Sequence, residues 1–196
     1  MPDAPTVAIL PGSRSNEVSR ILPGLAGAAA RIRAAIPAAQ FVVARAAHLE
    51  DRLFEAVRQH GIGPIAIVEG DTDTVLASSD VALTASGTAT VQTALHDTPM
   101  VIVYRMSPLS HYLLRRLVTV DTIGMVNLIA GERIVPELVQ DAFTPDAVAR
   151  EAVSMLTDRG RVAHIRAGLA RVRTALGGPG ASRRAAMAIM RVVGST

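Results

Sequence analysis

Short apolar runs alternate along the chain with stretches whose apolar residues recur every three or four positions. A continuous apolar run of this length is typical of a buried strand, whereas the longer period is typical of a helix. The runs that predict strands are Thr6–Leu10, Gln40–Ala44, Ile65–Val68, Asp80–Ala85 and Met100–Tyr104. The stretches that predict helices are Asn16–Ile36, Leu49–His60, Asp73–Ser78, Thr88–His96 and Leu109–Val118. This alternation indicates βαβ units, so we expect an α/β fold: a Rossmann-like parallel sheet with helices on both faces.

Two places in this pattern are less regular. Pro23 lies inside the first helical stretch, and we expect it to interrupt or restart that helix, because proline cannot donate the backbone hydrogen bond. The apolar stretch Thr122–Ala130 ends in Ala130-Gly131, which favours a short strand running into a loop.

Three helices are expected at the C-terminal end. Thr144 is a good N-cap before Pro145, which is suited to a first helical position. A second helix carries one apolar stripe at three- and four-residue steps, formed by Val162, Ile165, Leu169, Val172 and Leu176. Gly177–Gly180 then separates the last helix. We therefore predict an α/β domain over residues 1–157 and a helical extension over 158–196, which packs on that domain or on a partner subunit.

The amino-acid composition excludes several kinds of functional site. The chain has no cysteine, so disulfides, thiol nucleophiles and cysteine-ligated metals are excluded. The five histidines are scattered and no set of metal ligands is predicted. The N-terminus lacks the features of a signal peptide, and no apolar run approaches the ~18 residues of a membrane span. We expect a soluble protein that can still attach to a membrane surface.

Charge is distributed unevenly. All 20 basic residues are arginine, and eight of them lie in 158–196 beside a single acid, Asp158. Such a tail suits an anionic partner such as a phospholipid surface. The alternative is an ordinary solvated helix face.

Two loops have the composition of phosphate-binding turns. Pro11–Arg14 follows the first strand: Gly12 allows close approach, Ser13 can donate a hydrogen bond, and Arg14 offers a bidentate fork. The second, Ser86-Gly87-Thr88-Ala89, opens a helix whose start favours an anion. Each alone is more often a plain turn, but ligands of such sheets bind beyond the carboxyl ends of the strands, so two such loops together favour a diphosphate.

Three further positions remain ambiguous. Gln92 lies one helical turn beyond Thr88, and it either bonds ribose hydroxyls or faces solvent. Asp71-Thr72-Asp73 resembles a metal-binding D-x-D pair, but N-capping explains it better. Asn127 is either a turn residue or a hydrogen-bond donor to a sugar.

An ordered set of short motifs runs from about Pro5 to the end of the chain. The motifs are Leu10–Arg14, Glu17-Val18, Leu22-Pro23, Ala85–Thr90, Pro99–Val101, Tyr104–Pro108, Arg115–Val118, Asn127–Gly131 and Val135–Leu138. Together they resemble the C-terminal domain of the lipid-A-disaccharide synthases.

The resemblance implies the donor-binding half of a metal-independent, inverting GT-B glycosyltransferase of lipid A (lipopolysaccharide) biosynthesis. The family joins UDP-2,3-diacylglucosamine and 2,3-diacylglucosamine 1-phosphate, and no cofactor or nucleic acid is implied. The resemblance assigns active-site positions to Arg14 and Asn127. It assigns donor contacts to Gln92 and to the loops at Pro11–Arg14 and Ser86–Ala89. Gly131 and Glu137 are further candidate donor contacts. It also implies a homodimer, peripheral at the cytoplasmic face of the inner membrane.

The chain departs from the family pattern in three respects. Gln92 stands where relatives commonly carry Glu, and Val126 replaces a frequent Pro. The N-terminal half, with the acceptor site and the presumed carboxylate base, has no counterpart, so we expect a fragment or a product whose partner half is elsewhere. The rival interpretations are another UDP-sugar transferase or epimerase of the same architecture and a non-catalytic βα binding module.

Overall fold

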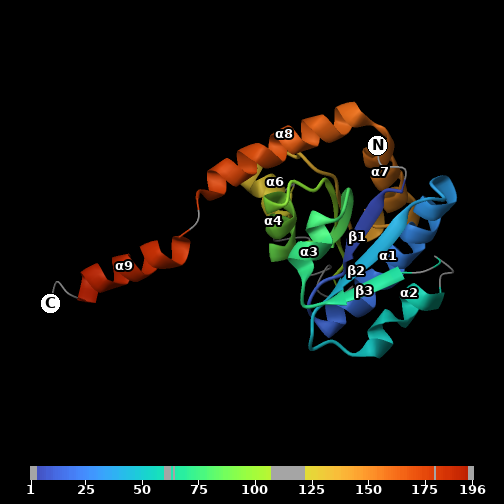
Figure 1. Ribbon diagram of the computed structural model, residues 1–196, viewed down its shortest axis with the longest axis horizontal. Coiled ribbons are helices and arrows are strands. Elements are labelled where there is room, and N and C mark those ends of the chain that lie inside the picture. The colour runs from blue at the N-terminus through green and yellow to red at the C-terminus, as the bar shows by residue number, and fades with distance from the viewer. Residues whose placement is uncertain (1–3, 60–62, 64, 107–121, 179, 194–196) are drawn as a thin grey trace.

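The computed structural model describes residues 4–59, 63, 65–106, 122–178 and 180–193 (Figure 1). Six parallel strands form one sheet in the order β3-β2-β1-β4-β5-β6. The strands are β1 (Thr6–Leu10), β2 (Gln40–Arg45), β3 (Ile65–Glu69), β4 (Val81–Ala85), β5 (Met100–Tyr104) and β6 (Glu137–Val139). Residues of β1, β4 and β5 are almost entirely buried, as expected of central strands covered on both faces.

The helices form two groups around the sheet. Their bounds are α1 (Ser15–Ala35), α2 (Glu55–Gln59), α3 (Thr72–Ala77), α4 (Thr88–Leu95), α6 (Met125–Ala130), α7 (Pro145–Thr157), α8 (Arg159–Leu176) and α9 (Ala181–Val193), with short 3-10 turns at Asp51–Phe54 and Gln140–Ala142. Helix α1 packs on α7, whereas α4, α6 and α8 pack on one another. Figure 1 shows α4 and α6 across the strands from α1 and α2. The predicted Rossmann-like sheet with helices on both faces is therefore confirmed.

The order of strands reverses direction between β1 and β4. From β1 the chain moves outward through β2 and β3, then returns to β4 on the other side of β1 and continues to β5. Right-handed crossovers place the connecting helices of the two directions on opposite faces. A crevice consequently opens between the loops that follow β1 and β4, the usual ligand position in such sheets.

The strand predicted within Thr122–Ala130 is wrong, because Met125–Ala130 forms helix α6. A short apolar run does not distinguish a strand from a buried helix. Gly131 ends the helix with a left-handed φ of 70°. The sixth strand is instead β6, which pairs with β5 and was not predicted.

Two helix predictions need further correction. Pro23 does not interrupt α1, which continues through it because Ile21, Leu22 and Leu25 are buried while Pro23 itself is exposed. Within Leu49–His60, a 3-10 turn precedes α2, so the helix begins later than expected. The helix predicted over 109–118 lies outside the described residues.

The last two helices differ in how much of their surface packs against the rest of the protein. Helix α8 buries Ile165, Leu169 and Val172 of its predicted stripe, while Val162 is half-buried and Leu176 is exposed. Helix α9 buries no residue and extends away from the body (Figure 1). None of the described helices is both long and apolar enough to cross a bilayer.

Candidate functional site

A cleft of about 460 Å³ lies at the carboxyl ends of four neighbouring strands. The residues that line it are Leu10, Gly12, Ser13, Arg14, Glu17, Ala44, Arg45, Ala46, Gly70, Thr72, Ala85, Ser86, Gly87, Thr88, Ala89, Gln92 and Met125. Both predicted phosphate-type loops are therefore in the same cleft, at the point where the strand order reverses. The fold brings together Arg14 and Gly87, which are far apart in sequence.

In the loop after β1, Gly12 adopts a backbone conformation that residues with a side chain rarely adopt. Gly12 has a φ of +111°, and a Cβ at this position would lie 2.2 Å from Oε2 of Glu17. The Glu17 carboxylate folds back over the loop and accepts a hydrogen bond of 3.2 Å from the backbone N–H of Ser13. The start of α1 thus already holds a negative charge supplied by its own first turn.

Arg14 lies at the N-cap of α1 with an exposed side chain. No acidic side chain in the described part of the chain is within ion-pair distance of it. The other arginine of the cleft, Arg45, is mostly buried and pairs with Asp51 and with Glu69 at 3.4 Å. Arg14 is therefore the better candidate to neutralise an anionic ligand, because its guanidinium is not already compensated.

The loop after β4 differs from the loop after β1. Gly87 is the N-cap of α4 with a φ of +149° and ψ of −161°, a region that side-chain-bearing residues rarely adopt. No side chain caps this helix, although the carbonyl of Gly87 accepts from the amide and the hydroxyl of Thr90. Thr88 and Ala89 line the cleft, and the first turn of α4 has neither a side-chain cap nor an acid of its own, which suits an anion.

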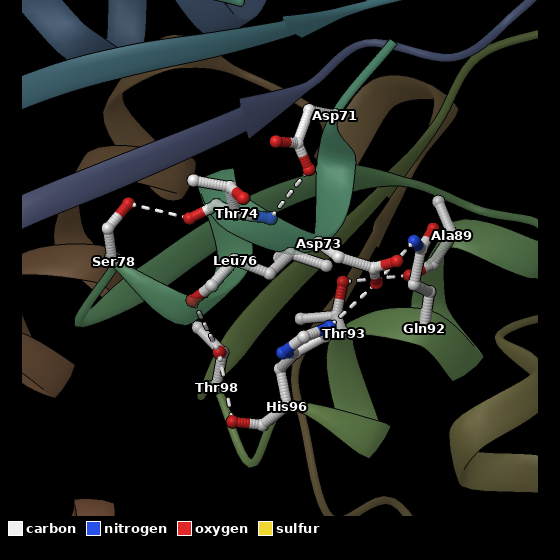
Figure 2. A network of polar contacts seen from close by, with 10 residues as sticks. All are labelled: Asp71, Asp73, Thr74, Leu76, Ser78, Ala89, Gln92, Thr93, His96 and Thr98. Atoms are coloured by element: carbon white, nitrogen blue, oxygen red, sulfur yellow. Dashed lines mark hydrogen bonds and ion pairs between the residues drawn. The ribbon is translucent and has the colours of Figure 1, made fainter.

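Gln92 lies on α4 one turn beyond Thr88 and contacts α3 as well as the cleft. Its Nε2 donates to Oδ1 of Asp73 at 2.8 Å, and Nε2 of His96 lies 2.7 Å from the same oxygen (Figure 2). These two hydrogen bonds, from Gln92 first and then His96, lower the pKa of Asp73. Asp71 is the N-cap of α3 and accepts from the Thr74 amide at 3.1 Å, in agreement with the capping interpretation of this acidic pair.

The three candidates after β5 lie apart from the cleft-lining residues of the described chain. Asn127 is 1% exposed, and its amide oxygen accepts from Ile134 N at 2.9 Å while its Nδ2 donates to Val135 O at 2.9 Å and Glu137 Oε1 at 2.6 Å. Glu137 also accepts from the amides of Ile123 and Gly124. Gly131 is the C-cap of α6. Asn127 and Glu137 thus fasten α6, whose first residue, Met125, lines the cleft.

Two residues shape the cleft without a role predicted from the sequence, Glu17 and His48. Glu17 has a recognisable signal, because a glutamate three residues after the N-cap commonly bonds back to the preceding backbone. His48 has none: its Nε2 lies 2.8 Å from the carbonyl oxygen of Ser13, across 35 residues of sequence. This contact holds the loop after β1 against the loop after β2.

Comparison with known proteins places these features in a family. A family model described as Lipid-A-disaccharide synthetase matches residues 1–192. The lipid-A-disaccharide synthase of Anaeromyxobacter sp. (strain K) is 43% identical over 190 residues, covering 96% of this chain and 49% of the relative. That of Syntrophus aciditrophicus (strain SB) is 37% identical over 192 residues, covering 97% of this chain and 50% of the relative.

Solved structures with low sequence identity share the fold. MnaA from S. aureus, solved with UDP, has a TM-score of 0.64 at 14% identity and covers 98% of this chain and 47% of its own. The calicheamicin glycosyltransferase CalG4 has a TM-score of 0.59 at 20% identity and covers 99% of this chain and 43% of its own. The chain spans about half the length of the curated relatives it matches. By its sequence over nearly its full length, the chain belongs to the lipid-A-disaccharide synthase family.

Proposed function

We propose that this chain binds the UDP-sugar donor of a lipid-A-disaccharide synthase, with the diphosphate in the cleft between β1 and β4. The observation that carries the proposal is that Arg14, which has no acidic partner among the described residues, shares one cleft with the uncapped start of α4. Arg14 supplies a guanidinium, and Thr88 and Ala89 supply backbone amides. The UDP complex of the structurally similar MnaA supports a nucleotide as the ligand.

The proposed reaction transfers 2,3-diacylglucosamine from UDP-2,3-diacylglucosamine to 2,3-diacylglucosamine 1-phosphate. The acceptor 6-hydroxyl oxygen attacks the anomeric carbon and loses its proton to a general base. The bond between that carbon and the UDP oxygen breaks, and its electron pair leaves with UDP. Arg14 and the α4 amides stabilise the charge that grows on the diphosphate, and fixed donors of this kind usually make a large catalytic contribution.

The acceptor pocket and the base are proposed to lie in the part of the relatives' length that has no counterpart in these 196 residues. Within this chain, Gln92 is proposed to bond the ribose. Asn127 and Glu137 are proposed to act by holding the start of α6 at the cleft, since Asn127 is buried and its amide is fully bonded, and Gly131 by ending that helix.

A peripheral position at the cytoplasmic face of the inner membrane and a homodimer are proposed for the whole enzyme. Helix α9 supports an interaction role, because it exposes Ile189, Met190 and Val192 by 63%, 70% and 74% and carries three arginines without an acid. An anionic membrane surface or a partner subunit would cover these side chains.

The test is titration calorimetry with UDP, together with a disaccharide synthesis assay. We expect UDP to bind this chain and synthesis to be absent or very slow, because no base or acceptor pocket is supplied. Robust synthesis by the isolated chain would contradict the division of roles. Absence of heat at millimolar UDP would favour a non-catalytic module, and equal affinity for acylated and unacylated UDP-sugars would favour another transferase or an epimerase.

A further inference from the structure

Helix α3 contributes Thr72 to the lining of the cleft, and its next residue, Asp73, contacts the lining residue Gln92. Asp73 lies in the first turn of α3 and receives two hydrogen bonds on the same oxygen, from Gln92 of α4 and from His96, the C-cap of α4 (Figure 2). The side chain of His96 is only 26% exposed, whereas that of Asp73 is 68% exposed. The three side chains therefore link the two helices at the rim of the cleft.

The chemistry of this contact fixes the orientation of the Gln92 amide. A glutamine amide ends in one acceptor, Oε1, and one donor group, Nε2, of nearly the same size. An ionised carboxylate accepts hydrogen bonds and donates none, so only Nε2 can face Asp73. The lowered pKa of Asp73 keeps this side chain ionised. Oε1 is then left without a partner among the described residues, on a side chain that lines the cleft.

We propose that Asp73 is a positioning residue for the donor: it turns the Gln92 amide so that its carbonyl oxygen accepts hydrogen bonds from the ribose hydroxyls. His96 holds Asp73 in place from the C-cap of α4. This inference rests on the proposed function, because it requires a ribonucleotide in the cleft. It assigns recognition of the ribose to a pair of residues on two helices and not to Gln92 alone.

The experiment uses the full chain and two probes, UDP and 2′,3′-dideoxy-UDP, which lacks both ribose hydroxyls. Calorimetry at fixed ionic strength gives the affinity ratio between them. We expect Q92A and D73A each to lower the ratio of UDP affinity to dideoxy-UDP affinity about three- to tenfold, the usual worth of one uncharged hydrogen bond. D73N retains an acceptor oxygen and is expected to restore most of the ratio.

Moving the negative charge from position 73 to position 92 tests whether Asp73 acts by orienting the Gln92 amide or only through its charge. In Q92E, two carboxylates face each other, and we expect weaker UDP binding. In Q92E/D73N, the asparagine amide donates to the carboxylate introduced at position 92, and we expect the affinity ratio to recover at least about threefold relative to Q92E. The matched control is D71N, which removes the same charge two residues away and keeps a residue that can cap α3. Because it removes a negative charge near the diphosphate, it is expected to alter both affinities equally.

The outcomes are distinguishable. If wild-type protein binds no UDP, the proposed function itself fails. If UDP binds and Q92A lowers the ratio but D73A does not, Asp73 has no positioning role and the inference is overturned. If D71N lowers the ratio as much as D73A, the effect is one of charge, and the inference is also overturned. Circular dichroism of each variant verifies that the fold is retained.

Discussion

Helices α1 and α4 start in similar ways and yet present different chemistry to the same cleft. Each follows a central parallel strand, and each is preceded by a glycine with positive φ. At α1, the Glu17 carboxylate already bonds the Ser13 amide. Neither helix start has a side-chain cap, but α4, unlike α1, carries no acid in its first turn.

The difference shows that a glycine turn before a helix does not by itself define an anion site. What matters is whether the helix start already carries a negative charge of its own. In this chain the α1 loop contributes a cation, Arg14, while the α4 loop contributes free amides. The two starts are therefore complementary, and a diphosphate that spans them would meet both kinds of donor.

Among the substitutions considered, G87A is expected to have the largest effect on UDP affinity, because Gly87 is the N-cap of α4. Its φ of +149° is strained for any residue with a Cβ, at a cost of order 1–3 kcal/mol, so the loop should move out of position. We expect UDP affinity to fall about thirtyfold by calorimetry. The matched control is G177A, a positive-φ glycine between α8 and α9, which should leave UDP affinity unchanged. Normal affinity in G87A would show that the α4 loop is not the phosphate site.

Removal of the cation at the α1 loop is expected to be the next largest effect. R14A should weaken UDP binding about tenfold, because a hydrogen bond to a charged group is lost, and the difference should shrink as salt is added. R20A removes an exposed arginine from α1 outside the cleft lining and serves as the control. Equal losses in R14A and R20A would assign the effect to general charge.

Neutralising Glu17 should act in the opposite direction. E17Q removes a negative charge from the cleft, and its amide oxygen can still accept from the Ser13 N–H. We expect UDP to bind about threefold more tightly in a calorimetric titration, and stability to fall slightly, because an acid in the first turn of a helix is worth about 0.3–1 kcal/mol. Weaker UDP binding in E17Q would mean that Glu17 itself contacts the ligand.

A third helix start provides a reference without any ligand role. Thr144 caps α7 by accepting from the Ala147 amide at 3.2 Å, away from the cleft. T144A should cost about 1 kcal/mol of unfolding free energy in urea denaturation and leave UDP affinity unchanged. A change in UDP affinity would reveal coupling between α7 and the cleft that the contacts do not explain.

The periodic parts of the fold could be predicted from the sequence, because strands such as Met100–Tyr104 and the cap at Thr144 are encoded locally. The predictions are wrong where the local structure depends on residues that are distant in sequence. Pro23 remains inside α1 because its neighbours are buried by other elements. Helix α6 is fixed by Glu137, which accepts from the amide of Gly124 13 residues earlier in the chain.

The site could be predicted in part for the same reason. Gly12, Arg14 and Gly87 lie beside predictable strand ends, and the order of the sheet brings them into one cleft. The composition of the loops also predicts the cation at Arg14 and the anion-binding helix start at Thr88, but it does not predict the contacts made by residues from other loops. The contact of His48 with the Ser13 carbonyl and that of Asp73 with Gln92 depend on which loops the fold brings together.

The most direct test of the unequal helix starts is a UDP titration followed by amide NMR on ¹⁵N-labelled protein. We expect the amide resonances of Thr88 and Ala89 to shift downfield as UDP saturates the cleft, while that of Ser13 stays near its unliganded position because Glu17 remains its acceptor. A large shift of Ser13 with none at Thr88 and Ala89 would show that the start of α4 is not the phosphate site.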